Sequence, residues 1–203
     1  MKFQILIFDG FEEMDVFGVF EPLRMAGFEV KLVSLETKQH ITGFYGTHVI
    51  PDEELDVQAI PDVLIVPGGG WITRAEAGAW AEAEKGTIIR ALQKFSEAKC
   101  IIASVCAGSM LLARAGLLTN RAATTNSLLL DELRQKQVNV IQARVVDDGD
   151  IITAGGITSS LDLGVWLVQR FLGADQALEV SRKLEFEPRG CVWQQNKSQI
   201  ESV

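Results

Sequence analysis

Residues 101–109 read IIASVCAGS, in which a cysteine joins an apolar run to a series of small residues. Its first half is an apolar run of the kind that forms a buried β-strand. Cys106 follows at once, and after a few small residues a helical pattern begins at Met110. A strand that turns sharply into a helix at one side chain is a nucleophile elbow, and Gly108 lets the chain reverse there without a Cβ clash. The sequence therefore predicts that Cys106 lies on such an elbow.

Two interpretations of Cys106 follow from this position. At a helix N-terminus, unpaired N–H groups favour the thiolate, which would make Cys106 a nucleophile. Alternatively it only packs, since free cysteine is among the most buried residue types. Cys100 falls inside the predicted strand and is expected in the core, whereas Cys191 has no neighbour that would activate it. Cys106 is thus the candidate nucleophile of this chain.

Outside this stretch, short strand-like runs alternate with longer helical ones. A first run ends at Asp9-Gly10 and a middle one ends at the glycines of residues 68–70. The alternation predicts an α/β fold with an open, mostly parallel sheet and helices on both faces. Ligands bind such sheets beyond the carboxyl ends of the strands. We therefore expect these two segments to meet the Cys106 elbow on one rim.

The remaining elements are assigned from periodicity and turn residues. A helix is expected over residues 12–26, where Pro22 should kink it or shift its boundary, with Gly27 as a C-cap. A β-hairpin or irregular ribbon is expected at 40–50, helices at 86–98, 127–137, 157–171 and 175–185, and short strands at the far side of the sheet at 138–141, 144–146 and 151–154. Residues 1–188 are expected to form a single domain, followed by a polar tail at 189–203.

Composition limits the class of function. The 203 residues carry a net charge of −8, with 23% charged and 47% hydrophobic residues, so a nucleic-acid-binding surface is not expected. No apolar run is long enough for a membrane span, and no signal peptide is expected at the start of the chain. The 3 cysteines have no paired spacing, which argues against a disulfide framework and a zinc site. A cytoplasmic location is the simplest expectation.

The glycines at 68–70 are the second feature of the predicted rim. They could form a plain flexible turn. Beside a thiol elbow, we favour an oxyanion hole made by the N–H groups of Gly69 and Gly70, with the N–H of Ala107 as partner. Trp71 follows directly and would either wall the pocket or cover the helix behind it.

A cysteine nucleophile normally needs a base or an acid nearby. His40 and His48 both fall in the hairpin region and are expected to be surface residues. Asp15 instead lies among apolar neighbours on the first helix, either as a helix-terminus acid or facing Cys106. A low-dielectric site does not easily hold both groups ionised, so Asp15 would then keep a proton and act as a general acid.

Several segments together resemble the ThiJ/PfpI superfamily, whose members are class I glutamine amidotransferase-like proteins, and within it the isonitrile hydratase branch. The matching segments run in order through most of the chain: FDGFEEMD (8–15), IVPGG (65–69), SVCAGS (104–109), AGLL (115–118), ATT (123–125) and ITAGGITSSLD (152–162). The resemblance implies a flavodoxin-like fold, a cytoplasmic homodimer, no metal and no organic cofactor.

The branch rests on two positions. Peptidase-like members carry a histidine directly after the nucleophile, where this chain has Ala107, and hydratase-like members carry an aspartate that Asp15 matches. Hydratases often have a hydroxyl residue where Ala107 stands, and the family often has histidine where this chain has Asn126, so both positions bear on the expected pocket.

The resemblance implies a hydratase that converts an isonitrile, a small carbon–nitrogen electrophile, to an N-substituted formamide. Cys106 and Asp15 would be the catalytic residues. Gly69, Gly70, Ala107, Trp71 and Asn126 would bind the small-molecule substrate or stabilise its oxyanion. The alternatives are an amidase, peptidase or glyoxalase-type enzyme with the same thiol, and a non-enzymatic redox or electrophile sensor.

Overall fold

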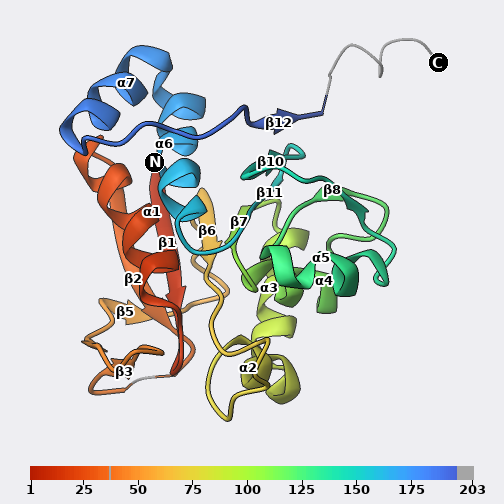
Figure 1. Cartoon of the computed structure of the whole chain (residues 1–203). Helices are drawn as coiled ribbons and strands as arrows, with labels where there is room; N and C mark the ends of the chain where they lie inside the picture. Colours follow the sequence, from red (N-terminus) through yellow and green to blue (C-terminus); the bar gives the residue numbers. More distant parts are fainter. Residues whose placement is uncertain (37, 196–203) are drawn as a thin grey trace.

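The structure, a computed structural model, describes residues 1–36 and 38–195. Its centre is an open 8-stranded sheet in the order β12-β10-β11-β7-β6-β1-β2-β5 (Figure 1). Neighbouring strands are parallel except β10 and β11. The strands of this sheet are β1 (Lys2–Ile7), β2 (Glu29–Ser34), β5 (Glu53–Glu54), β6 (Val63–Val66), β7 (Ile101–Val105), β10 (Val145–Asp147), β11 (Ile151–Ala154) and β12 (Trp193–Gln194).

Helices cover both faces of the sheet (Figure 1). One group packs together as α1, α6 and α7, and the other as α2, α3 and α4. The helices are α1 (Glu13–Met25), α2 (Ala79–Lys85), α3 (Thr87–Glu97), α4 (Gly108–Arg114), α5 (Leu130–Arg134), α6 (Ser159–Leu172) and α7 (Ala174–Lys183), with a 3-10 turn η1 (Ser127–Leu129) before α5. The predicted flavodoxin-like α/β class is confirmed.

The central strands are apolar on both faces because helices cover both sides. All residues of β6 are buried, and β1 is buried after its first residue. The connection from β1 through α1 leads to β2 on one side, whereas β6 and β7 lie on the other. The order therefore reverses at β1, and the carboxyl ends of β1, β6 and β7 meet where such sheets bind ligands.

Helix α1 differs from the sequence expectation at Pro22. The helix continues through Pro22 to Met25, so Pro22 does not shift its boundary. Gly27 caps its end, as predicted: the Gly27 N–H donates to the Arg24 carbonyl at 3.0 Å, and the Phe28 N–H donates to the Leu23 carbonyl at 3.1 Å. This is the bonding pattern of a glycine-terminated helix.

The short outer strands were predicted less well. The hairpin is present as β3 (Ile41–Thr42) antiparallel to β4 (His48–Val49). However, β9 (Asn139–Val140) pairs with β8 (Ala122–Ala123) in a separate sheet, not at the far side of the central one. Helix α2 was not expected. Two-residue strands carry too little periodicity to be assigned to a sheet from sequence.

The predicted tail contains one ordered feature. Within it, β12 pairs in parallel with β10 at the edge of the central sheet. Residues 196–203 of the predicted tail lie outside the described residues. None of the helices in the described part is long and apolar enough to cross a membrane.

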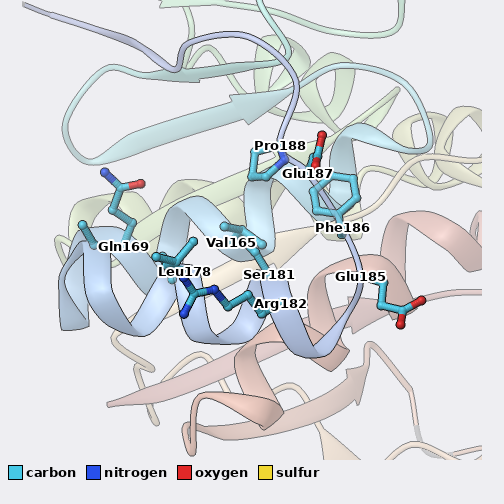
Figure 2. A pocket seen from close by; sticks show the side chains of 11 residues that line it. Val165, Gln169, Leu178, Ser181, Arg182, Glu185, Phe186, Glu187 and Pro188 are labelled. Carbon is cyan, nitrogen blue, oxygen red and sulfur yellow. The ribbon is translucent and has the colours of Figure 1, made fainter.

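A groove of about 570 Å³ lies between α6, α7 and the segment that follows α7. Figure 2 shows Val165, Leu178 and Phe186 among its lining side chains. None of the candidate site residues lines this groove.

Candidate active site

Cys106 occupies a sharp turn between β7 and α4, as the sequence predicted. Its φ is 54°, a left-handed conformation that non-glycine residues rarely adopt outside strained turns. Its N–H lies 3.1 Å from the Ala154 carbonyl and 3.0 Å from the Gly155 carbonyl, and the Thr125 hydroxyl donates to its carbonyl at 2.8 Å. Bonds on both sides of the residue hold it in the strained conformation.

Gly108 is required by the same turn. A Cβ at this position would lie 2.1 Å from the Val66 carbonyl oxygen. The start of α4 therefore packs directly on the backbone of β6, which places the elbow beside the glycine segment that follows β6.

Asp15 is fully buried on α1 and lies beside the elbow. Its Oδ2 accepts the Gly68 N–H at 2.8 Å, and its buried Oδ1 has no hydrogen-bond partner in the described part of the chain. A Cβ on Gly68 would stand 3.0 Å from Asp15 Oδ2 and 3.1 Å from the Cys106 Cβ. Glycine at 68 thus allows the carboxyl group and the cysteine to approach from opposite sides.

Burial dominates the electrostatics of this pair. It raises the pKa of Asp15 well above its usual value, and the Gly68 N–H only partly opposes it. Burial, with a smaller contribution from the negative charge of Asp15, raises the pKa of the Cys106 thiol to about 12. The helix terminus was expected to favour the thiolate, but here desolvation outweighs the nearby donors.

Three donors face the sulfur. The Asn126 Nδ2 lies 3.4 Å from Cys106 Sγ, and the N–H groups of Ala107 and Ile157 also lower the pKa of the thiol. Asn126 Oδ1 accepts the Leu128 N–H at 3.0 Å, which directs the amide nitrogen to the sulfur. Asn126, predicted to lie in the pocket, therefore contacts the candidate nucleophile directly.

A pocket of about 150 Å³ opens above Cys106. The structure brings the following predicted residues to its lining: Cys106, Gly69, Gly70, Ala107, Trp71 and Asn126. Asp15, the other predicted catalytic residue, does not line the pocket and is buried against Gly68. The strand-end rule thus placed these segments correctly on one rim.

The glycines have a structural role as well as a place in the pocket. Gly69 has a φ of 115°, and a Cβ there would lie 2.1 Å from the Gly10 carbonyl oxygen. The carbonyls of Gly69 and Gly70 accept the N–H groups of Ala79 and Ala75. Their own N–H groups donate to no residue in the described ranges, so both remain available at the pocket.

Trp71 fulfils both expected roles. It lines the pocket and is buried against Trp80, with the ring centroids 5.3 Å apart. Its Nε1 lies 3.2 Å from Glu132 Oε1, which fixes the indole in place. The wall of the pocket is therefore rigid at this position.

Five residues that line the pocket were not predicted to do so: Glu12, Phe44, Ile72, Thr73 and Ile157. Glu12 was expected only as the first residue of the first helix, but it is 8% exposed, lines the pocket and has its pKa raised by burial and by the nearby Glu13. Ile157 has a φ of 39°, a rare conformation for a β-branched residue. Glu12 lies just after the end of the first strand, and this position could have predicted its place in the pocket. Nothing in the sequence indicated the positive φ of Ile157.

The histidines lie apart from the pocket. His40 and His48 stack at 4.3 Å on the hairpin, and both are exposed, as expected. Among the described residues, no group of at least 3 His, Cys, Asp or Glu side chains is arranged to hold a metal ion.

Comparisons with known proteins agree with this geometry. The DJ-1/PfpI family profile matches residues 1–170. The chain is 31% identical over 189 residues to the isonitrile hydratase of Pseudomonas putida, covering 93% of this chain and 79% of that protein. It is also 31% identical over 159 residues to a deglycase of Thermococcus kodakarensis, covering 76% of this chain and 89% of that protein.

A solved structure also indicates membership of this family. A ThiJ/PfpI family protein from Pseudomonas syringae superposes with a TM-score of 0.79 at 26% identity, covering 93% of this chain and 76% of that one. The family profile, the relatives and the fold agree, and the chain belongs to the DJ-1/PfpI family.

Proposed function

We propose that this protein is a cysteine-dependent hydratase that converts a small isonitrile to an N-substituted formamide. The observation that carries the proposal is the buried Asp15 carboxyl, with one unpartnered oxygen, beside the Cys106 elbow. The similarity to the isonitrile hydratase of Pseudomonas putida supports it. No histidine lines the thiol pocket in the described part of the chain, so the acid–base role falls to the carboxyl group.

In the first step, Cys106 and Asp15 together carry one proton, which is transferred to the substrate. In the reacting arrangement Asp15 holds it, and the Cys106 sulfur attacks the terminal carbon of the isonitrile. A carbon–sulfur bond forms and the carbon lone pair takes the proton from Asp15, which gives a thioimidate and an ionised carboxylate. The raised pKa of Asp15 favours its protonated form, which lets the carboxyl group act as the proton donor in this step.

Water completes the reaction. The Asp15 carboxylate takes one proton from water as the oxygen adds to the thioimidate carbon, and this proton passes to the nitrogen. The carbon–sulfur bond then breaks, the hydroxyl proton returns to the cysteine–aspartate pair, and the formamide leaves. The N–H groups of Gly69, Gly70 and Ala107 stabilise the negative charge that develops, while Trp71 and Asn126 position the substrate.

We further propose that the protein works as a cytoplasmic homodimer in which residues 1–188 form one domain. Large apolar side chains are exposed on α1 at Met14 and Phe17 and on the hairpin at Phe44 and Tyr45. The two elements are joined, since the Tyr45 N–H donates to Glu13 Oε1 at 2.8 Å. An apolar face of this kind is typical of a subunit interface. The 3 cysteines are free, which fits a reducing compartment.

The test is formamide production from a panel of alkyl and aryl isonitriles. Wild type should turn over at least one of them, and Cys106→Ala should abolish the reaction. Cys100→Ala is the matched control, because Cys100 is also buried but lies outside the pocket. Full activity in Cys106→Ala would contradict the mechanism.

Because the chain is also similar to a deglycase, the same experiment should include glyoxal-type substrates, which test for a glyoxalase-type or amidase activity. Consumption of glyoxal-type substrates by wild type, with no isonitrile turnover, would favour a glyoxalase-type or amidase reaction of Cys106. No turnover of any substrate, with Cys106 oxidised by peroxide, would favour a sensor.

A further inference from the structure

A second cleft lies next to the thiol pocket. It measures about 630 Å³ and shares Asn126 and Ile157 with the pocket, so the two spaces are neighbours across these side chains. Its lining carries hydroxyl groups, amides and one guanidinium, and no carboxylate. Its chemistry therefore differs from that of the thiol pocket, which contains Glu12 and several apolar side chains.

Two hydroxyl groups on largely buried residues of this cleft have no partner in the described part of the chain. Thr124 and Ser159 are each 2% exposed, and neither hydroxyl makes a hydrogen bond to another residue within the described ranges. Ser159 Oγ lies 3.1 Å from where a Cβ on Gly155 would stand, so glycine leaves this hydroxyl open toward the cleft. Neither oxygen is fully buried, so both hydroxyl groups are accessible to a ligand in the cleft.

The cation of the cleft is held in a fixed orientation. Arg144 donates to Asp162 Oδ2 from Nε at 2.8 Å and from Nη2 at 2.5 Å, and its Nη2 also reaches the Thr158 hydroxyl at 3.1 Å. Its Nη1 donates to no residue in the described part of the chain. The guanidinium therefore presents one pair of unused donors, and an arginine edge of this kind suits an oxyanion.

The N-terminus of helix α6 adds to the positive electrostatic potential of the cleft. It begins at Ser159 and extends for 14 residues, so its positive end lies at the cleft beside the unpartnered hydroxyl. Asp162 is engaged by Arg144 and by the Arg189 N–H at 2.8 Å, and it is not part of the lining. The open donors of the cleft thus face no carboxylate of the lining.

We propose that this cleft binds a carboxylate on the substituent of the substrate, so that the preferred substrates are isocyano-carboxylates and the products N-formyl amino acids. This proposal rests on the proposed hydratase function. The isonitrile carbon lies at Cys106, the substituent passes Asn126 and Ile157, and the carboxylate meets Arg144, Thr124 and Ser159. Arg144 and the two hydroxyls are specificity residues and take no part in bond making.

The experiment measures product binding by calorimetry, which requires no turnover. The probes are N-formylglycine and its longer homologue N-formyl-β-alanine, each compared with its uncharged methyl ester. Wild type should bind at least one acid about tenfold more tightly than its ester, the magnitude expected for charge-assisted hydrogen bonds. Arg144→Gln should abolish this preference, and Thr124→Val with Ser159→Ala should reduce it severalfold.

The control is Arg134→Gln, which removes an equal charge from α5 outside the cleft and should retain the preference. The hydroxyl variant removes only unpartnered groups, so it remains a test if Arg144→Gln fails to fold. Equal binding of acid and ester by wild type, or a preference that survives in both variants, would overturn the proposal. Acid preference without any isonitrile turnover would overturn the hydratase reaction and leave the carboxylate site standing.

Discussion

Asp15 and Cys106 illustrate the cost of placing two ionisable groups in one buried site. Each loses hydration, and Asp15 regains only one hydrogen bond, from Gly68. Because both pKa values are raised, the pair favours states with fewer charges. Such a site lowers the stability of the protein in return for reactivity. Removal of the Asp15 carboxyl group should therefore raise the stability.

We predict that Asp15→Asn loses most of kcat but is at least as stable as wild type at neutral pH. The folded carboxyl has a raised pKa, so the folded state binds a proton that the unfolded state has lost, and stability falls as pH rises through this range. Asparagine does not ionise, so the Asp15→Asn variant does not lose this stability as the pH rises. Thermal unfolding between pH 4 and 8 should show a gain in Tm over wild type that grows with pH, with a shift of about 2–4 °C per kcal/mol. A large destabilisation at pH 7 would contradict this account.

The pH profile of kcat/KM provides an independent check. If the active enzyme carries one proton on the pair, activity falls at low pH when a second proton binds and at high pH when the last one leaves. The raised pKa of Asp15 places the acid limb above the ordinary carboxyl range, and the thiol pKa of about 12 delays the alkaline limb. An acid limb near the ordinary carboxyl value would show that Asp15 is not buried in the working enzyme.

At the level of elements, the contact between α1 and α6 positions Asp15. Gly18 faces Ser160, and a Cβ on Gly18 would lie 2.1 Å from Ser160 Oγ. One turn further, a Cβ on Gly164 would lie 2.8 Å from a ring carbon of Pro22. The two helices therefore approach through glycines, and Pro22 is accommodated because it packs on a residue without a side chain.

We predict that Gly18→Ala destabilises the protein by about 2 kcal/mol, the scale of overpacking a close contact. Ser160→Ala alone should be neutral or stabilising, since its hydroxyl is buried without a partner in the described part of the chain. Adding Ser160→Gly to Gly18→Ala should recover part of the loss. Urea denaturation of these variants and of Ser160→Gly alone measures these values, and strictly additive effects of Gly18→Ala and Ser160→Gly would contradict a direct contact.

The same elements show how much could be predicted from the sequence. The long helices and the buried strands have clear periodicity, and the elbow at Cys106 and the carboxyl at Asp15 were found because a strand end and an apolar context mark them. Glu12 was missed since its burial depends on the Gly68 carbonyl, which accepts the Glu12 N–H at 3.1 Å from a distant segment. The raised pKa of the Cys106 thiol was missed for the same reason. The thiol is desolvated only in the folded protein, where segments that are distant in the sequence pack around it.

For the whole molecule, the exposed apolar face on α1 and the hairpin predicts self-association. Phe44 belongs both to this face and to the thiol pocket, so a dimer would also shield the pocket mouth. Sedimentation velocity at micromolar concentration should show a dimer for wild type and a monomer for Phe17→Glu with Tyr45→Glu. The control is Leu178→Glu, an exposed apolar position on α7. A wild-type monomer would contradict this prediction.

We infer that Cys106 and Asp15 together hydrate an isonitrile. The most direct measurement is formamide release from an isonitrile panel by wild type, Cys106→Ala, Asp15→Asn and Cys100→Ala. We expect turnover in wild type and Cys100→Ala, none in Cys106→Ala, and a loss of most of kcat in Asp15→Asn. An undiminished rate in either Cys106→Ala or Asp15→Asn would contradict it.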